Sequence, residues 1–385
     1  MTILQKLPVP SNKLFVWVFI PYIKTEQGLV SEDFDLPAGR QELEDVFAEL
    51  GIKWKWQPVT LENMHAVVEE IAASSTEYIP VVLNYSSGAD EIDGYPGVSL
   101  VKLLEEKGII STGADSHCYD LTTYKVAMKR AFIEAGVATA PYEVISDSSR
   151  VQGVCDRLGT PLIVKPAINL GRSTGISLKS VVFTDDQVSV QVQQLPQDLH
   201  NVKVKLPPDS IFVERFINGR EFTVFLLGSA QQPESIKIYP PAERVFHSSL
   251  PETEQFLSFD RDWSKHEEET LSSEEPSHRY QLVTSELHDK LCELSKRAYC
   301  AVDGNGYGRV DLRMDQASEE LFVLEVNPNC GISSKPVTDQ FDPIATCVGT
   351  ILHLAGISFA QLMSEIIAEA FDRHSTKSPL VSKSA

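Results

Sequence analysis

Near its end the chain reads Tyr307-Gly-Arg-Val-Asp-Leu-Arg313 and then Leu321-Phe-Val-Leu-Glu-Val-Asn-Pro-Asn-Cys-Gly331. Each apolar run is typical of a short buried strand. Residues two apart on a strand face the same side, so Arg309 and Asp311 share one face. The two runs therefore predict neighbouring strands that bring charged side chains into one site.

Oxygen-bearing side chains lie at the ends of these two strands, namely Asp311, Glu325 and Asn327. Carboxylate and amide oxygens suit Mg²⁺, which binds few protein ligands together with substrate phosphates. Arg309 adds a fixed cation, and this combination suits phosphoryl chemistry. The competing interpretation is that the three residues only cap and turn the chain, because Asn-Pro-Asn and Gly are common in loops. The upstream sequence favours the site.

The composition is that of a globular protein with two or three domains. The chain has 385 residues, of which 42% are hydrophobic and 23% are charged. The formal net charge of -20 argues against bulk binding of nucleic acid or anionic membranes, although a local cluster of Lys and Arg can still hold one nucleotide. We recognise no signal peptide and no membrane-spanning run. The 6 cysteines show neither a Cys-x-x-Cys pair nor zinc spacing, so we expect reduced thiols in a cytoplasmic protein.

Alternating strands and helices predict a small parallel α/β domain over residues 1–115. Its expected strands are 13–20, 53–59 and 79–83, and its expected helices are 39–50, 61–73 and 100–107. Gly51 and Gly108 follow two of these helices, at the position where glycine commonly ends a helix.

Two α+β domains are expected to follow. The central one, 116–215, has expected helices at 122–135 and 151–158, strands at 141–145 and 161–165, and further elements at 187–194 and 211–216. The third, 216–374, has expected strands at 221–228, 235–239, 307–314 and 321–326 and helices at 285–301, 343–354 and 359–370. Residues 247–278 are polar and acidic, and form either a solvated loop or a mobile lid over an active site. We expect the tail, 375–385, to be disordered.

A phosphate-binding segment is expected at Lys165-Pro-Ala-Ile-Asn-Leu-Gly-Arg-Ser-Thr-Gly-Ile-Ser177. A strand ends in lysine and a glycine-rich loop follows, which can present a point charge and backbone N–H groups to phosphate. The alternative is an ordinary hairpin. The chain has neither a Gly-x-x-x-x-Gly-Lys-Ser/Thr loop nor a Gly-x-Gly-x-x-Gly turn after its first strand. A P-loop and a classical dinucleotide site are therefore not supported.

Two further clusters are compatible with a nucleotide. Lys125 and Lys129 lie one turn apart in an expected helix. Glu214, Phe216 and Glu221 place two acids and an aromatic ring around a turn of the chain. A nucleobase needs an apolar slot, and a ribose needs a carboxylate that accepts its hydroxyl protons. Both glutamates could equally be surface charges.

Taken in order, these segments resemble the ATP-grasp superfamily, and within it the D-alanine–D-alanine ligase-like enzymes. The resemblance covers residues 33–371. It rests on motifs in the family's order, which are Asp120-x-x-x-x-Lys125-x-x-x-Lys129, Ile163-Val-Lys-Pro166 with Gly171-x-Ser173-x-Gly175, Val213-Glu214 with Gly219-Arg-Glu-Phe-Thr-Val224, Gly308-Arg-Val-Asp311, and Leu324-Glu-Val-Asn327 with Gly331. It implies an α/β (α+β) fold of three domains, in which an N-terminal parallel α/β domain precedes two α+β domains that clasp ATP.

The resemblance also assigns roles by position. Lys125, Lys165 and Lys265 would contact the ATP phosphates, and the loop around Ser173 would fold over them. Glu214, Phe216 and Ile217 would meet the adenine, and Glu221 the ribose. Asp311, Glu325 and Asn327 would hold two Mg²⁺ ions, with Mn²⁺ as a substitute. Arg309 and the Gly331 N–H would stabilise an oxyanion.

The implied reaction is ATP-dependent amide formation between a small carboxylic acid and an amine or amino acid. The carboxylate attacks the γ-phosphate to give an acyl phosphate, and the amine then displaces phosphate. A closed lid would keep water away from the acyl phosphate. The family likeness also suggests a homodimer as a candidate assembly.

The sequence departs from the family's pattern near the substrates. Asp33 stands where the family has a longer acid that holds an ammonium group, and Arg172-Ser173 replaces a serine pair. Pro336 falls where a serine would bind a carboxylate, which leaves Ser334 or Lys335 for that role. Arginine suits a bidentate carboxylate, so we hypothesise an acid with an extra carboxylate, a dicarboxylic acid. The competing interpretation is that Arg172 packs against the lid or a phosphate.

Two alternatives stand for the whole chain. One is a true D-alanine–D-alanine ligase, which the departures near the substrates argue against. The other is a catalytically inactive, nucleotide-binding regulatory protein. Retention of Asp311, Glu325 and Asn327 argues against the second alternative, since an inactive site has no need of metal ligands.

Overall fold

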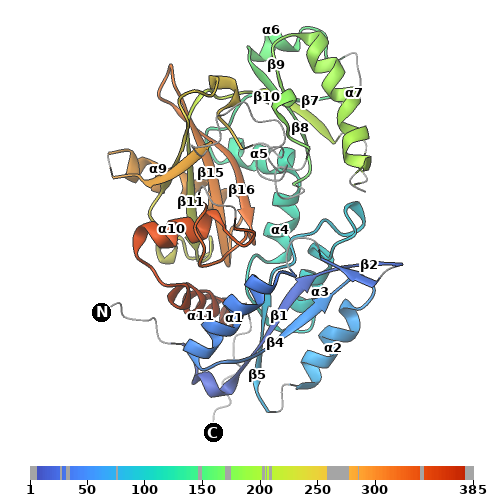
Figure 1. Ribbon diagram of the computed structural model, residues 1–385, viewed down its shortest axis with the longest axis vertical. Helices are drawn as coiled ribbons and strands as arrows, with labels where there is room; N and C mark the ends of the chain where they lie inside the picture. Colours follow the sequence, from blue (N-terminus) through green and yellow to red (C-terminus); the bar gives the residue numbers. More distant parts are fainter. Residues whose placement is uncertain are drawn as a thin grey trace.

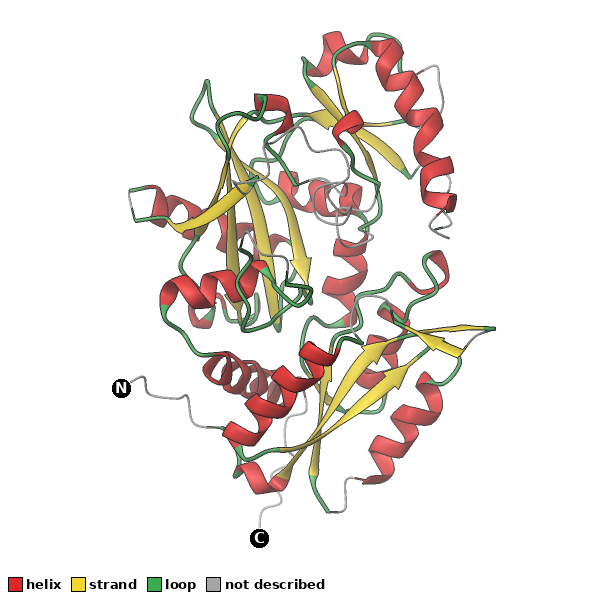
Figure 2. Cartoon of the chain, in the orientation of Figure 1, coloured by secondary structure: helices red, strands yellow, loops and turns green. Residues whose placement is uncertain are grey.

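Three main sheets with helices packed on them form the fold (Figures 1 and 2). The computed structural model describes residues 7–26, 28–31, 35–74, 77–145, 150–169, 175–201, 204, 206–207, 210–257, 277–284, 286–338 and 342–377. In Figure 1 the first sheet lies at the bottom, the central sheet at the upper right and the six-stranded sheet at the left.

The first sheet is parallel, with the strand order β4-β1-β5-β6. Its strands are β1 (Leu14–Pro21), β4 (Lys53–Val59), β5 (Ile79–Asn84) and β6 (Ile110–Ser111), and its helices are α1 (Pro37–Leu50), α2 (Met64–Ser74) and α3 (Val98–Glu106). β1 is apolar because both of its faces are buried. Val16 and Val18 share a core with α1, whereas Trp17 and Phe19 share one with α2 and α3. A hairpin of β2 (Ile23–Thr25) and β3 (Gly28–Val30) follows β1.

The central sheet has the order β7-β10-β8-β9 and is antiparallel. Its strands are β7 (Tyr142–Val144), β8 (Leu162–Pro166), β9 (Val181–Val182) and β10 (Ile211–Arg215), and its helices are α6 (Val154–Leu158) and α7 (Asp185–Asn201). Leu162 and Val164 pack under the two helices. Because strand side chains alternate, Lys165 and Glu214 point to the other face. The central sheet therefore presents charged groups on the face that its helices leave uncovered.

The third sheet has the order β14-β13-β11-β15-β16, and β12 pairs with β11. Its strands are β11 (Gly219–Leu227), β12 (Lys237–Ile238), β13 (Ala242–Phe246), β14 (His278–Leu282), β15 (Tyr307–Asp315) and β16 (Leu321–Pro328). One face is covered by α4 (Ser116–Thr123), α5 (Lys125–Glu134) and α9 (Leu287–Ala301). Next to this sheet, α10 (Cys347–Ala355) and α11 (Phe359–Lys377) share a core with β1 and α1 of the first sheet. This shared core joins the first sheet to the third.

Several elements differ from the sequence-based expectation. The predicted helix 122–135 is wrong at its start, because Tyr124 is extended and pairs with Ile168, which separates α4 from α5. These helices pack on the six-stranded sheet through Met128 and Phe132, although the sequence places them in the central domain. β13 and β14 were not predicted. The predicted boundaries between domains otherwise stay predictions.

The two segments predicted to lack regular structure are only partly described. α11 continues to Lys377, into the segment 375–385 for which disorder is expected, so that expectation is wrong for the residues that α11 contains. Residues 258–276 of the predicted polar loop lie outside the described residues, and β14 begins at His278. Among the described residues no single helix has the length and hydropathy to cross a membrane. α10 and α11 pass that test by length and composition only as a pair bent by 114°.

Candidate active site

A cavity of about 560 Å³ lies where the three sheets approach one another. Its wall on the six-stranded sheet includes Arg309, Asp311, Glu325 and Asn327. The central sheet contributes Lys165 and Glu214, and the first sheet and α1 contribute residues such as Glu42, Trp56 and Tyr85. The sequence motifs that are far apart along the chain therefore meet around one volume.

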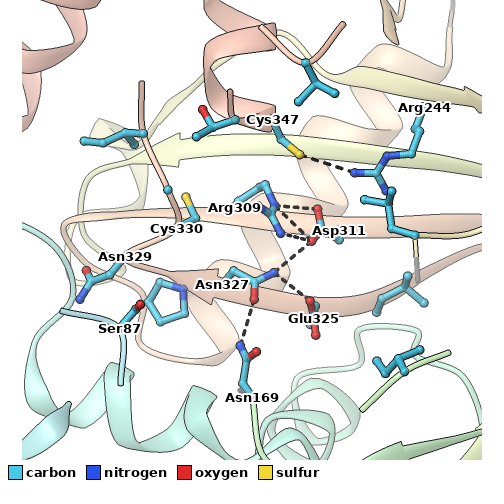
Figure 3. A pocket seen from close by; sticks show the side chains of 18 of the residues that line it. Ser87, Asn169, Arg244, Arg309, Asp311, Glu325, Asn327, Asn329, Cys330 and Cys347 are labelled. Carbon is cyan, nitrogen blue, oxygen red and sulfur yellow. Dashed lines mark hydrogen bonds and ion pairs between the residues drawn. The ribbon is translucent and has the colours of Figure 1, made fainter. Parts of the chain in front are cut away.

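The predicted metal ligands converge on one point (Figure 3). Asp311 and Glu325 lie directly opposite each other on β15 and β16. The amide Nδ2 of Asn327 lies 3.0 Å from Asp311 Oδ2 and 3.0 Å from Glu325 Oε1, so both carboxylates face the same position. The Oδ1 atom of Asn327 accepts a hydrogen bond from Asn169 at 3.0 Å. Strand register alone brings the two carboxylates and the amide together.

Cations hold the two carboxylates in place. Arg309 binds Asp311 with two donors, Nε at 3.0 Å from Oδ1 and Nη2 at 2.8 Å from Oδ2. Although burial disfavours a charged guanidinium, Asp311 keeps the pKa of Arg309 well above its usual value. Lys125, at the first position of α5, binds Glu325. Burial alone would raise the pKa of the Glu325 carboxyl, but the Lys125 ammonium outweighs it and lowers that pKa.

A second cluster joins two lysines to Glu214. Lys165 Nζ lies 2.6 Å from one carboxylate oxygen of Glu214, and Lys129 Nζ lies 2.6 Å from the other. Burial would raise the pKa of the Glu214 carboxyl, but the two ammonium groups lower it to about 2. Lys129 is 1% exposed and also donates to Thr139 at 2.7 Å, whereas Lys165 lines the cavity. Only one of the two lysines is thus placed to meet a ligand.

The predicted base slot lies beside this cluster. Phe216 and Ile217 are buried and line the cavity. The ring of Phe216 packs edge-on against that of Phe256, with 5.7 Å between the ring centroids. Glu221, predicted for the ribose, lines the cavity as well and pairs with Arg244. The apolar slot and the carboxylate expected for a nucleoside therefore lie together.

The loop after β16 is arranged differently from the prediction. Gly331 and Arg309 both line the cavity. Ser334 and Lys335 are exposed, and the described residues that line the cavity include neither. Ser334 instead binds Glu42 of α1, through its backbone N–H at 2.7 Å and its hydroxyl at 2.6 Å. The two residues predicted to hold a substrate carboxylate are therefore not brought into the cavity.

Four predicted site residues lie outside the described residues, namely Asp33, Arg172, Ser173 and Lys265. Within the described part no group of three or more His, Cys, Asp or Glu side chains could hold a metal ion. Among the described residues, Asn327 is the neighbour that could add an oxygen ligand to Asp311 and Glu325.

Sequence reasoning missed several side chains of the cavity. Glu42 lies on the amphipathic helix α1, whose apolar pattern gives no sign of a carboxylate that faces a cavity. Burial raises the pKa of the Glu42 carboxyl, and the two Ser334 hydrogen bonds oppose that rise. Arg244 lies on the unpredicted strand β13. Thr346 caps α10 by accepting from Gly349 N–H at 2.8 Å, and a threonine before an apolar run could have marked this helix start.

Comparisons with known proteins identify the family of this chain. A family model described as "D-ala D-ala ligase C-terminus" matches residues 132–368. The chain belongs to this family. D-alanine–D-alanine ligases of Bordetella petrii and Geobacter sulfurreducens are 28% and 27% identical to it over 309 and 268 residues. The alignments cover 78% of this chain and 78% of the Bordetella protein, and 70% of this chain and 71% of the Geobacter protein.

Solved structures of D-Ala-D-Ala ligase relatives share the fold. A D-alanine–D-alanine ligase of Bacillus anthracis complexed with ATP matches with a TM-score of 0.62 and 18% identity, over 94% of this chain and 99% of that chain. The VanG D-Ala:D-Ser ligase of Enterococcus faecalis matches with a TM-score of 0.62 and 16% identity, over 94% and 99% of the two chains. The predicted family, fold class and enzyme class are confirmed. This D-Ala-D-Ala ligase family member is an ATP-dependent ligase that forms a C–N bond and releases ADP.

Proposed function

We propose that this ligase activates a small carboxylic acid as an acyl phosphate and transfers the acyl group to an amino acid or amine. The observation that carries the proposal is the unbroken row of ion pairs and hydrogen bonds from Arg309 through Asp311, Asn327 and Glu325 to Lys125, all on one wall of the cavity. Such a row places fixed cations and hard oxygen ligands beside the position of a transferring phosphoryl group.

ATP would bind across the central and six-stranded sheets. Lys125 and Lys165 would bind the phosphates, exchanging their carboxylate partners Glu325 and Glu214 for phosphate oxygens. The adenine would occupy the slot at Glu214, Phe216 and Ile217. Because the Glu214 carboxylate already holds two lysines, the adenine would be met through the backbone and the apolar side chains of this segment. The Glu221 carboxylate would accept a hydrogen bond from a ribose hydroxyl.

The three oxygen-bearing side chains fit Mg²⁺. The Nδ2 atom of Asn327 occupies the point on which Asp311 and Glu325 converge, and a half-turn of this amide would place Oδ1 there instead. Two carboxylates and one amide oxygen leave coordination positions for ATP phosphates, which is the usual manner of Mg²⁺ binding. When bound, two Mg²⁺ ions would neutralise negative charge on the phosphates, with Mn²⁺ as a substitute.

Arg309 and the Gly331 N–H would stabilise the oxyanion of the tetrahedral intermediate that forms when the amine attacks the acyl phosphate. Arg309 is held by Asp311 and lines the cavity, so its charge is fixed before the reaction begins. The N-terminus of α10 also faces the cavity through Thr346 and Cys347. Backbone N–H groups at such a helix end suit a substrate carboxylate, a role the sequence gives to Ser334 or Lys335.

The substrates follow from the relatives and from the other wall of the cavity. The curated relatives are D-alanine–D-alanine ligases, which makes D-alanine the first substrate to test. Glu42 offers a carboxylate for a substrate ammonium group, in the role the sequence gives to Asp33. The hypothesis of a dicarboxylic acid held by Arg172 is kept as the alternative. A cytoplasmic location and a homodimer also stay proposals. So do the roles at the ATP phosphates of Ser173 and Lys265, which lie outside the described residues.

A screen of ADP release, crossing acids with amines, tests the proposal. It should include D-alanine alone, D-alanine with other amino acids, and dicarboxylic acids. We expect ADP only when both an acid and an amine are present, and none from the Asp311→Asn, Glu325→Gln double variant. ADP release that ignores the acid, or release of AMP, would overturn the acyl-phosphate assignment.

A further inference from the structure

Three charged side chains lie in register across neighbouring strands of the six-stranded sheet. Glu221 on β11 pairs with Arg244 on β13 on one side and with Arg313 on β15 on the other. Directly opposed residues on adjacent strands project from the same face, and all three line the cavity. One buried carboxylate therefore has a guanidinium on each side.

The two guanidiniums are satisfied to different extents. Arg244 binds Glu221 Oε1 through Nη1, Tyr280 through Nε at 2.8 Å and Cys347 Sγ through Nη2 at 3.5 Å. Arg313 uses Nη2 to donate to the carbonyls of Gly219 at 2.9 Å and Gln255 at 2.7 Å. Its Nε atom has no hydrogen-bond partner among the described residues. Arg244 thus holds Glu221 in place, whereas the Nε donor of Arg313 is available to a ligand.

The unsatisfied donor lies close to the free side of the carboxylate. Arg313 Nε is 3.9 Å from Glu221 Oε2, too far for a hydrogen bond but close enough for one oxygen atom to contact both. Arg313 is only 3% exposed, and its guanidinium packs over the ring of Phe216 at 4.8 Å. A buried donor without an acceptor costs free energy, which a ligand that supplies an acceptor would recover.

We propose that Arg313 and Glu221 together bind one ribose hydroxyl of ATP. A hydroxyl both accepts and donates, so its oxygen can accept from Arg313 Nε while its proton goes to Glu221 Oε2. A carboxylate could not donate to Glu221, and an ammonium group could not accept from Arg313. The inference rests on the proposed function, which places the ribose at Glu221. It makes Arg313 a specificity-determining residue for the sugar of the nucleotide.

The same contacts are also compatible with a purely structural role, in which Arg313 links the carbonyls of Gly219 and Gln255. The two roles differ in one respect, which is whether Arg313 senses the sugar hydroxyls. Arg220 provides a matched control, since it neighbours Glu221 on β11 but pairs with Glu243 at 2.6 and 2.7 Å. Arg220→Met makes the same substitution as Arg313→Met, but on the opposite face of the sheet.

Calorimetric titration of the full chain with ATP, 2′-deoxy-ATP and 3′-deoxy-ATP, in the presence of Mg²⁺, tests the proposal. For the wild type we expect loss of one of the two hydroxyls to raise Kd about tenfold. Arg313→Met should lower that ratio toward one, since Glu221 alone still accepts the hydroxyl proton, and Arg220→Met should leave it unchanged. Arg313→Lys keeps the charge but not the Nε donor, so it should lower the ratio as well. This variant replaces the methionine variant if the latter does not fold.

Each outcome of the titrations either supports or overturns the proposal. Equal affinity of the wild type for all three nucleotides overturns the proposal, as does an Arg313→Met or Arg313→Lys variant that keeps the full preference. If the wild type binds no ATP at all, the proposed function itself fails. Binding of ATP without preference for a hydroxyl removes only the role of Arg313.

Discussion

The cavity has two walls of opposite character. The charged wall, formed by the six-stranded and central sheets, carries Arg309, Asp311, Glu325, Lys165 and Glu214, and each of these side chains has a partner of opposite charge. The apolar wall, formed by the first sheet and α1, carries Ile20, Leu43, Trp56 and Tyr85 around the carboxylate of Glu42. We therefore propose that the phosphoryl chemistry belongs to one wall and the choice of substrate to the other.

The two walls also differ in the contacts that fix their side chains. On the charged wall, strand register fixes the distance between opposing groups, as between Asp311 and Glu325 on β15 and β16. The apolar wall is joined to the reaction centre by a loop contact, the hydrogen bonds from Ser334 to Glu42. If the proposed roles of the two walls hold, a change of substrate specificity can arise on α1 or in this loop without disturbing the residues of the charged wall.

The largest effect is expected from the metal ligands of the charged wall. The Asp311→Asn, Glu325→Gln double variant should lower the rate of ADP formation by about 10³-fold or more, because amides bind Mg²⁺ much more weakly than carboxylates and carry no charge to balance Arg309 and Lys125. A coupled assay of ADP release measures it. Glu320→Gln, an exposed substitution next to β16, should leave the rate unchanged. A double variant with near wild-type rate would remove the metal assignment.

Glu214 gives the charged wall a pH dependence of stability. The lysines lower the pKa of its carboxyl from 4.5 to about 2. A carboxyl whose pKa is lower in the folded state stabilises the fold above its unfolded pKa, and this stability is lost as pH falls from about 4.5 toward 2. Glu214→Gln should therefore cost on the order of 3 kcal/mol at pH 7. Urea titrations from pH 7 to pH 3 should show the gap to wild type closing as pH falls, and a constant gap would contradict the account.

The two lysines of the same cluster should separate binding from stability. Lys165→Met should raise Kd for ATP about tenfold, because Lys165 lines the cavity and is proposed to bind the phosphates. Lys129→Met should leave Kd nearly unchanged but lower the free energy of unfolding. The loss should be smaller than the roughly 3–5 kcal/mol of a fully orphaned buried charge, since Lys165 still faces Glu214. Equal effects of both variants on Kd would show that the division between the lysines is wrong.

The smallest effect is expected on the apolar wall. Glu42→Gln should raise KM for the amino substrate by about tenfold, through loss of a charge-assisted contact, and leave Kd for ATP unchanged. Glu44→Gln is the matched control, because Glu44 lies on the exposed side of α1, where it accepts from Trp54 Nε1 at 3.2 Å. If Glu42→Gln weakened ATP binding as much as substrate binding, the two walls would not be functionally separate.

The charged wall was largely predictable from the sequence, for a physical reason. Its residues sit at the ends of apolar runs whose period marks strands, so Arg309 and Asp311 could be placed on one face from spacing alone. Spacing could not place Glu42. On α1 its carboxylate cannot be told from the solvated carboxylates of the same amphipathic helix. Nor could it place Arg244, since the residues of β13, Ala-Glu-Arg-Val-Phe, do not alternate between polar and apolar side chains and so give no strand signal.

The break between α4 and α5 has a different origin. Helix propensity continues through Tyr124, but this residue is extended and pairs with Ile168, while Lys125 N–H donates to the Ala167 carbonyl at 2.7 Å. Tertiary contacts of this kind override local preference. The break also sets the first turn of α5 beside the loop after β8, so that Lys125 reaches Glu325.

The central claim is that the charged wall drives transfer of the γ-phosphoryl group to a substrate carboxylate. It is tested most directly with the acid that supports ADP release, labelled with ¹⁸O in both carboxylate oxygens. An acyl-phosphate intermediate predicts that each released phosphate carries one ¹⁸O atom from that carboxylate. Phosphate free of the label, formed together with the amide product, would contradict the account.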